Sequence, residues 1–391
     1  MTGQHARLWS GELRALYLLS LVFGCAMGLF NPLVSAYMEQ HGADSIWIGA
    51  VSSIFFTGVA LGAPLAQRVV RRRGARFAMV AGLGLAALTG AAFPFSESLI
   101  SWCTMRALAG IGIGMTMVAG QSRLNACAAE SARVTINSLY ALAFGIGMGI
   151  GPLIGTGLYR TSASAAFACG AVMLGLGALL GWRCIGAAPG GARKPDSRLL
   201  KRLALPLHGA FAYGFAEAVL MSLYPVFLLR HGYTLEQVGY AFSAFVVGAL
   251  VATLPLALAA DRYGSARILF CCAFVGACST LALALVDLRA LTFVCALLAG
   301  ASLGPVFAIS LAMIGNVVAT EELPSGTALF TASFSIGAAV APVFAAAAMN
   351  AWGDGQVFSI VIVLFAGLAL RLAIRLGRGE CRSGAVLERL S

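Results

Sequence analysis

Two ionisable side chains stand inside long apolar stretches of this sequence, Glu217 and Arg106. The other Asp, Glu, Lys and Arg residues fall in the polar segments between such stretches or, for Arg14 and Arg371, within a few residues of the end of one. A carboxyl group can bind and release a proton or pair with a cationic group, and a guanidinium can balance a carboxylate or hold an anion. The same two residues could instead form a structural ion pair, or face water in a wide cavity.

The apolar stretches that hold them are long enough to cross a membrane. Of the 391 residues, 60% are hydrophobic and 10% charged, whereas a soluble domain carries about 25% charged residues. The composition therefore excludes a soluble enzyme. A membrane-spanning helix needs about 20 apolar residues, and twelve stretches qualify: 13–38, 46–66, 77–96, 99–120, 134–158, 164–182, 203–229, 237–260, 268–286, 290–318, 326–349 and 357–374.

The depth of the two charges follows from the rise of a helix. At 1.5 Å per residue, Glu217 lies roughly 21 Å into the seventh helix, and Arg106 about 10 Å from the opposite end of the fourth. Measured from the same side of the membrane, the depths of the two residues differ by roughly 8 Å. An arginine side chain or one water molecule can span this difference. An unpaired charge at such depth costs about 2.5–3.5 kcal/mol or more. We therefore expect both residues to be functional.

Basic residues gather on one side of the expected membrane. Of the 26 Lys and Arg residues, 22 fall in the segments on the side of the two termini, which predicts that both termini are cytoplasmic. The net charge of +11 thus reflects orientation and does not indicate a nucleic-acid partner. The expected parts are a cytoplasmic N-terminus (1–12), two six-helix bundles (13–182 and 203–374), a cytoplasmic linker (183–202) and a cytoplasmic tail (375–391).

The two bundles are copies of one another in sequence. An offset of 190 residues pairs Gly24 with Gly214, Gly74 with Gly264, and Phe144 with Phe334, and it holds without a gap from the first helix to the fifth. Since an even number of spans restores the starting side, the chain reads as two parallel six-helix repeats, a plan known among transporters. Glu217 pairs with Met27, so its carboxyl breaks the repeat.

Three local patterns extend this interpretation to a family. The fourth helix holds Arg106, Gly110 and Gly112 in an R-x-x-x-G-x-G pattern, and the fifth holds a G-x-x-x-G-P-x-x-G pattern: Gly147, Gly151, Pro152 and Gly155. The loop after the eighth helix contains Asp261, Arg262, Gly264 and Arg267. Over residues 13–375 the chain resembles the major facilitator superfamily. That resemblance implies an all-helical membrane fold of twelve spans, and the pattern in the fifth helix resembles one found mainly in antiporters of the family.

The two loop copies differ from each other. In the first half the loop reads LAQRVVRRRGAR, with Gln67 where the resemblance implies an aspartate of the conformational gate. Asp261 could carry that role from the second half, and Arg68 and Arg71–Arg73 could be cytoplasmic anchors. In the fifth helix, Gly151-Pro152 marks a place that can bend, while closely spaced glycines let another helix approach. Ordinary small-residue packing is the alternative.

The resemblance also implies that the first, fourth, seventh and tenth helices line a central cavity. Polar candidates for that cavity are Asn31, Gln121, Tyr213 and Asn316. The sequence contains no phosphate-binding loop of the G-x-x-x-x-G-K-[ST] type, no zinc motif and no dinucleotide loop, and its ten cysteines form no C-x-x-C pair. We therefore expect no cofactor, no metal and no enzymatic activity.

Together these features predict a secondary active transporter of a small organic solute in the cell inner membrane. Proton coupling through Glu217 and efflux by antiport are the leading expectation, with rocking of the two bundles around a midplane site. Uptake by proton symport is the alternative, and a transport-inactive receptor or scaffold is the alternative from another class. The expected partners are protons, a small-molecule substrate and the lipid bilayer, with no nucleic acid, and we expect a monomer.

Overall fold

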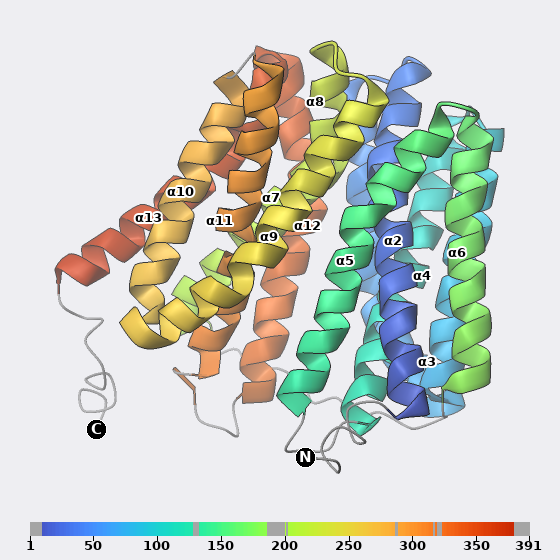
Figure 1. Ribbon diagram of the computed structural model, residues 1–391, viewed down its shortest axis with the longest axis horizontal. Helices are drawn as coiled ribbons and strands as arrows, with labels where there is room; N and C mark the ends of the chain where they lie inside the picture. The colour runs from blue at the N-terminus through green and yellow to red at the C-terminus, as the bar shows by residue number, and fades with distance from the viewer. Residues whose placement is uncertain are drawn as a thin grey trace. The chain divides into compact units, whose positions relative to one another are not determined.

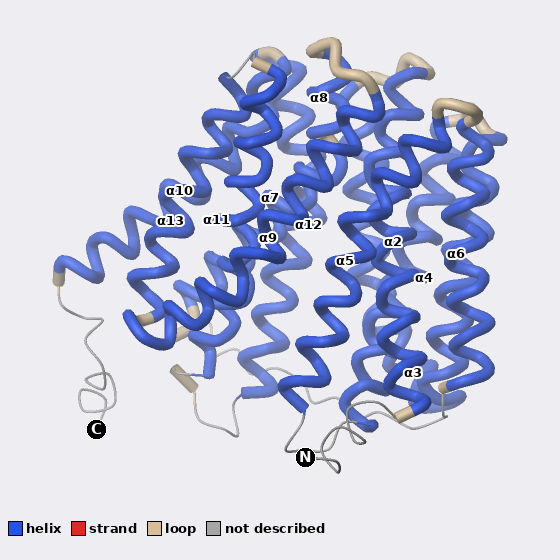
Figure 2. The backbone as a smooth tube through the Cα atoms, in the orientation of Figure 1, coloured by secondary structure: helices blue, strands red, loops and turns tan. Residues whose placement is uncertain are grey.

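The computed structural model contains only helices and their connections within the residues that it describes (Figure 2). These are residues 10–127, 133–185, 200, 202–285, 288–315, 317–318 and 323–378. The predicted cavity residue Asn316 lies outside them, as do most of the predicted linker and nearly all of the predicted tail.

The helices follow one another along the chain, and the connections that the structure describes in full are short (Figure 1). The elements of the first half are α2 (Gly11–Gln40), α3 (Ser45–Ala92), the 3-10 turn η1 (Phe93–Phe95), α4 (Leu99–Cys127), α5 (Arg133–Tyr159) and α6 (Ala163–Cys184). Those of the second half are α7 (Ala204–Ser222), α8 (Tyr224–Arg230), α9 (Leu235–Tyr263), α10 (Ser265–Leu285), α11 (Arg289–Gly315), α12 (Leu323–Trp352), the 3-10 turn η4 (Asp354–Phe358) and α13 (Ser359–Gly377).

Among the described residues, eleven helical segments are long and apolar enough to cross a membrane. One of them, Ser45–Phe95, is 51 residues long and is interrupted at Gly74, where φ is 85° and ψ is 163°. Only glycine adopts such angles without strain, so the backbone turns there and α3 comprises two spans. Twelve spans result, which confirms the number predicted from the sequence.

Two predicted spans end or break differently in the structure. The span predicted over 203–229 is interrupted at Leu223, between α7 and α8. Pro225 follows at the start of α8 and cannot donate the backbone hydrogen bond that would continue α7. The span predicted over 77–96 leaves the α-helix at Ala92 and closes with η1, which contains Pro94.

The chain divides into two compact units, which are described separately. Unit 1 comprises Met1–Ala192 and Met221–Ser243, and unit 2 comprises Arg193–Leu220 and Ala244–Ser391. In unit 1, α3 packs along α4 and α6, and α2 packs along α5; in unit 2, α10 packs against α11 and α13. Packing thus assigns the segment 221–243, from the second half of the sequence, to unit 1. The domain boundaries stated above stay a prediction.

The sequence repeat is also a repeat of helix packing. A Cβ atom built at Gly24 would lie 2.2 Å from the carbonyl oxygen of Phe144, and one built at Gly214 would lie 2.3 Å from that of Phe334. Both glycines therefore allow the same close backbone approach, α2 to α5 in unit 1 and α7 to α12 in unit 2. Gly264 has a φ of 94°, close to that of its partner Gly74. The 190-residue offset hence marks equivalent positions within each unit.

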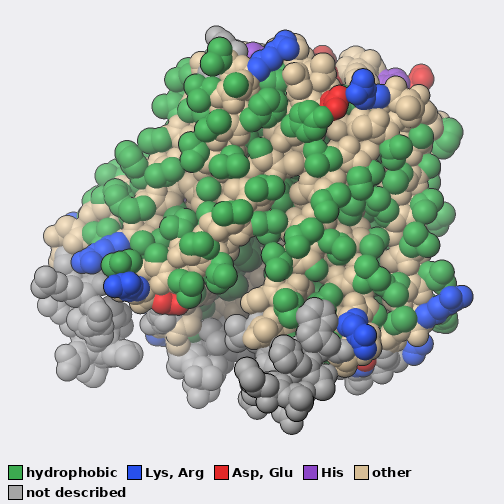
Figure 3. All heavy atoms as spheres, viewed as in Figure 1, with side chains coloured by type: hydrophobic (Ala, Val, Ile, Leu, Met, Phe, Trp, Pro, Cys, Tyr) green, Lys and Arg blue, Asp and Glu red, His purple; other side chains and the backbone are tan. Residues whose placement is uncertain are grey.

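The exposed surface fits a lipid environment. On the face seen in Figure 3, hydrophobic side chains cover the middle of the helices, whereas charged side chains lie near the helix ends. In α9, Val251, Leu254 and Leu258 share one helical face and are each more than half exposed. In water such a continuous apolar face would be unfavourable, whereas in a bilayer it contacts hydrocarbon.

Candidate functional site

Arg106 lies on α4 inside unit 1 and is buried, with 6% of its surface exposed. The carbon atom at the centre of its guanidinium lies 3.8 Å from the centre of the Phe55 ring of α3, an arrangement that stabilises a cation against an aromatic face. Its Nε atom is buried without a hydrogen-bond partner in the described part of the chain. Arg106 is thus held by its flat face, with its Nε–H left unused.

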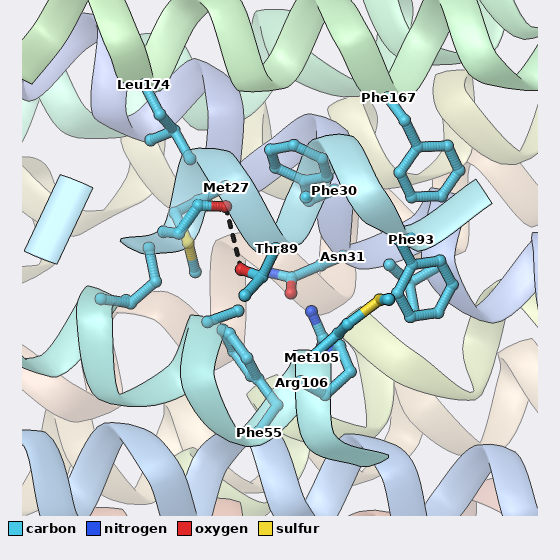
Figure 4. A pocket seen from close by; sticks show the side chains of 15 residues that line it. Met27, Phe30, Asn31, Phe55, Thr89, Phe93, Met105, Arg106, Phe167 and Leu174 are labelled. Atoms are coloured by element: carbon cyan, nitrogen blue, oxygen red, sulfur yellow. Dashed lines mark hydrogen bonds between the residues drawn. The ribbon is translucent and has the colours of Figure 1, made fainter. Parts of the chain in front are cut away.

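A small pocket adjoins this guanidinium, between α2, α3, α4 and α6 (Figure 4). Apart from Arg106, its polar side chains are Asn31 and Thr89. The Asn31 amide donates a hydrogen bond of 3.5 Å to the sulfur of Met221. The Thr89 hydroxyl donates to the carbonyls of Leu85 and Ala86 on its own helix. The remaining walls are apolar side chains such as Phe30, Phe93, Met105 and Phe167.

Helix packing explains how Phe55 comes to lie beside Arg106. Gly110 follows Arg106 by four residues and therefore shares its helical face. A Cβ atom at Gly110 would lie 2.2 Å from the carbonyl oxygen of Phe55, so α3 and α4 touch through their backbones at this level. The glycine of the R-x-x-x-G-x-G pattern thereby places the Phe55 ring against the guanidinium. Arg106 and Asn31, predicted separately from the sequence, come together in one pocket.

Glu217 lies in unit 2, on α7. Its side chain is partly exposed. No described residue of this unit forms an ion pair or a hydrogen bond with its carboxyl group. One helical turn earlier, the ring of Tyr213 packs against those of Phe307 and Phe334, with ring centres 5.5 Å and 6.0 Å away. Glu217 therefore stands beside an aromatic cluster.

The other predicted cavity residue in the described part, Gln121, lies near the end of α4. Its side chain is exposed and donates a hydrogen bond of 2.6 Å to Asn137 of α5. The pairing of Arg106 with Glu217 stays a prediction, because the two residues belong to different units.

The predicted gating loop joins α9 to α10. Asp261, Arg262 and Arg267 are exposed, and Gly264 forms the turn. Arg262 lies over the ring of its neighbour Tyr263, at 5.3 Å from the ring centre. Asp261 forms no ion pair with another described residue, so its gating contacts stay a prediction.

The glycines of the α5 pattern are contact points with α2. Cβ atoms at Gly147 and Gly151 would lie 2.0 Å and 2.1 Å from the backbone carbonyl oxygens of Leu21 and Cys25. A Cβ atom at Gly155 would meet the Leu29 side chain at 2.8 Å. The pattern therefore permits backbone contact between α2 and α5 at Gly147 and Gly151, and close side-chain contact one turn further on at Gly155.

Sequence reasoning missed a second set of polar contacts, made within unit 1 by segment 221–243. Arg230 forms a two-pronged ion pair with Glu39 of α2, at 2.7 Å and 3.0 Å. Arg160, at the end of α5, pairs with Glu236 of α9 at 2.8 Å. The buried Ser243 hydroxyl donates to the Gly149 carbonyl of α5 at 2.7 Å. These contacts, called the outer seam below, join residues far apart in sequence.

Fold and site together define a multi-pass helical membrane protein of two repeated units, with the buried Arg106 in one and the partly exposed Glu217 in the other. The chain belongs to the Major Facilitator Superfamily, whose family model matches residues 16–206 and 207–380. Members of this family are transporters and not enzymes, and the chain is accordingly a transporter of this superfamily.

Relatives and solved structures agree with this family. The MFS-type transporter YfkF of Bacillus subtilis is 24% identical over 372 residues, covering 92% of this chain and 94% of its own. The MFS-type transporter YcaD of Escherichia coli is 25% identical, covering 87% and 90%. In fold, the chain is similar to the nucleoside transporter NupG, with a TM-score of 0.75, 15% identity and coverage of 94% and 99%. It is also similar to an inward-facing bacterial homologue of the human lysosomal transporter Spinster, with a TM-score of 0.75, 13% identity and coverage of 93% and 95%.

Proposed function

We propose that this protein is a proton-coupled secondary transporter that exports a small organic solute by antiport. Glu217 binds and releases the coupling proton, and transport proceeds by alternating access around the interior of the helix bundles. The protein resides in the cell inner membrane with both termini in the cytoplasm, in keeping with the 22 basic residues on that side.

The single observation that carries the proposal is the position of Glu217. It is a carboxyl group on the apolar helix α7, close to where that helix ends at Ser222, and no Lys or Arg among the described residues of its unit forms an ion pair with it. A charge at this depth is unfavourable by about 2.5–3.5 kcal/mol or more. A protein that needed only a stable fold would be better served by an apolar residue there, as at the equivalent position Met27. Reversible protonation gives the carboxyl a reason to be present.

Alternating access also requires contacts that can form and break. The outer seam suits this role, because its ion pairs are at least partly exposed to solvent and contribute only modestly to stability. Its buried member is the Ser243 hydrogen bond, and the weak contact between Asn31 and Met221 lies at the start of the same segment. We propose that segment 221–243 leaves α2 and α5 when this side of the transporter opens.

The direction of export rests on the glycine-proline pattern of α5, which resembles that of antiporters. In this protein the pattern brings α5 against α2, while Gly239 of the outer seam packs against Thr156 and Pro152 of the same helix. A helix in contact with both α2 and the outer seam is well placed to couple solute binding to opening.

The test is proton flux in proteoliposomes that contain a pH-sensitive dye, with an imposed gradient of each compound in a panel of organic solutes. Antiport predicts proton movement against the direction of solute flow, and symport predicts movement along with it. Glu217→Gln should abolish the coupled proton flux, whereas Glu97→Gln, the same change at an exposed site, should leave it intact. Absence of flux with every solute would favour a receptor or scaffold, and unchanged flux in Glu217→Gln would remove the coupling role.

A further inference from the structure

The charge of Arg106 has no counterpart in the pocket that it faces. The lining of this pocket contains no carboxylate, and the described residues offer Arg106 neither an ion pair nor a hydrogen bond. A guanidinium does not lose its proton in a protein, so it stays charged in a setting where an uncompensated charge is strongly unfavourable. Stacking on Phe55 provides only part of the compensation, since a cation–π contact contributes about 0.5–2 kcal/mol.

We propose that the pocket beside Arg106 is a binding site for a small monovalent anion, and that the anion is a carboxylate. This assignment rests on the proposed function in one respect: it identifies the exported solute as a small carboxylic acid anion. The binding site itself lies within unit 1 and is complete without residues of unit 2.

The geometry of the guanidinium favours a carboxylate. Phe55 occupies one flat face of the guanidinium, so the N–H groups at its edge remain for a ligand, among them the unpartnered Nε–H. Such an edge matches the two oxygens of a carboxylate in a two-pronged arrangement. Asn31 lies next to the guanidinium in Figure 4, and its amide has a second N–H beyond the one donated to Met221.

The walls of the pocket define the rest of the ligand. They are almost wholly apolar, which disfavours divalent anions and favours an ion with a hydrocarbon part. The free space holds only about one or two groups of the size of a water molecule. Formate is the carboxylate nearest to this size, and the flexible side chains of Met27 and Met105 would yield to admit acetate or a slightly longer acid.

Chloride carries the same single charge as a carboxylate and is the other small anion that fits a site of this charge. The experiment must therefore separate carboxylate binding from chloride binding. The measurement is equilibrium binding of radiolabelled acetate to the purified full-length protein, at fixed pH and ionic strength. Unlabelled formate, propionate, chloride and sulfate serve as competitors. We expect one saturable site per chain, displaced by formate and propionate and at least tenfold more weakly by chloride and sulfate.

Variants connect the binding to this pocket. Arg106→Leu should weaken acetate binding at least tenfold, and the exposed control Arg375→Leu should not change it. Since Arg106→Leu could impair folding, Met27→Glu offers a second approach, because it places a carboxylate in the pocket beside an intact Arg106. Met27→Glu should abolish acetate binding, whereas Ser98→Glu, which adds the same carboxylate at an exposed site, should keep the affinity within about threefold.

Three results would overturn the inference: no acetate binding by the wild-type protein, unchanged binding in both Arg106→Leu and Met27→Glu, or displacement by chloride as strong as by formate. The outcome is separate from that of the proton-flux experiment. If the wild-type protein does not bind acetate but shows coupled proton flux with other solutes, the carboxylate site alone is refuted. Binding without any proton flux would refute the proposed transport and leave the site in place.

Discussion

The outer seam offers a direct test of alternating access, through the ion pair between Arg230 and Glu39. Both ends of this pair are partly buried, with side-chain exposures of 29% and 19%, and the contact is two-pronged. Exposed ion pairs contribute about 0.2–1 kcal/mol, and hydrogen bonds to charged groups about 1.5–3 kcal/mol when well shielded. At this partial exposure we assign about 1 kcal/mol to the pair. Because 1.4 kcal/mol is a factor of ten in an equilibrium, Arg230→Glu should raise the open population about fivefold, and repulsion between the two carboxylates should raise it further.

The assay follows the accessibility of Ser243, whose buried hydroxyl contacts Gly149 only while the seam is closed. A cysteine at this position, in a background without the native cysteines, is labelled by a maleimide in purified protein. The labelling rate should rise at least fivefold in Arg230→Glu and in Glu39→Arg. It should return to within about twofold of the starting rate when both substitutions are combined, since the swapped pair restores the attraction. Equal rates in all four proteins would refute the assignment of this pair to a gate.

Three further predictions concern coupling and packing. Glu217→Gln should reduce proton-coupled flux at least tenfold while solute exchange without a proton gradient persists, and loss of both in proteoliposomes would indicate a structural role. Gly151→Ala should destabilise the protein by about 1–3 kcal/mol, because the new Cβ would overlap the Cys25 carbonyl. Gly157→Ala, in the same helix with open space around it, should be neutral or stabilising; equal melting temperatures of the two variants would contradict the packing argument. Gly264→Ala should cost about 1–2 kcal/mol, because its positive φ strains any side chain, and an unchanged melting temperature would show that the loop relaxes.

Much of the fold could be predicted because the sequence repeats its own contact points. Gly24 and Gly214 mark the same helix crossing in each unit, and both were visible as one constant offset. The interruption of the seventh span at Leu223 was harder to predict, although the sequence contains Pro225 two residues later. Pro32 stands inside α2 without ending it, so a proline in an apolar stretch does not by itself determine whether a helix bends or stops. The packing of the segment that follows the proline determines whether the helix bends or stops.

The candidate site was only half visible in the sequence. Arg106 and Asn31 stand out because polar residues are rare in apolar stretches. Phe55 and Thr89 do not stand out, because phenylalanine and threonine are ordinary residues of a membrane helix. The contact between Phe55 and Arg106 depends on how closely α3 approaches α4. The signal that could have revealed it is Gly110, one turn after Arg106, which indicates a close helix crossing at that level.

Arg106 and Glu217 share a property that the repeat makes plain. Glu217 corresponds to Met27 in the first half, and Arg106 corresponds to Ala296 in the second. Positions that preserve the repeat, such as the glycines of the helix crossings, build equivalent contacts in both units and so serve the fold. Positions that break the repeat, such as Glu217 and Arg106, place a charged side chain in one unit only. Met27 lines the pocket of Arg106, so the position that carries the acid in one half is an apolar wall of the basic site in the other. A symmetrical chain would have placed an acid beside each base and neutralised both internally. Among the described residues of each unit, the asymmetry leaves the Glu217 carboxyl and the Arg106 guanidinium without an ion pair, which is what the proposed carrier of a proton and an anion requires.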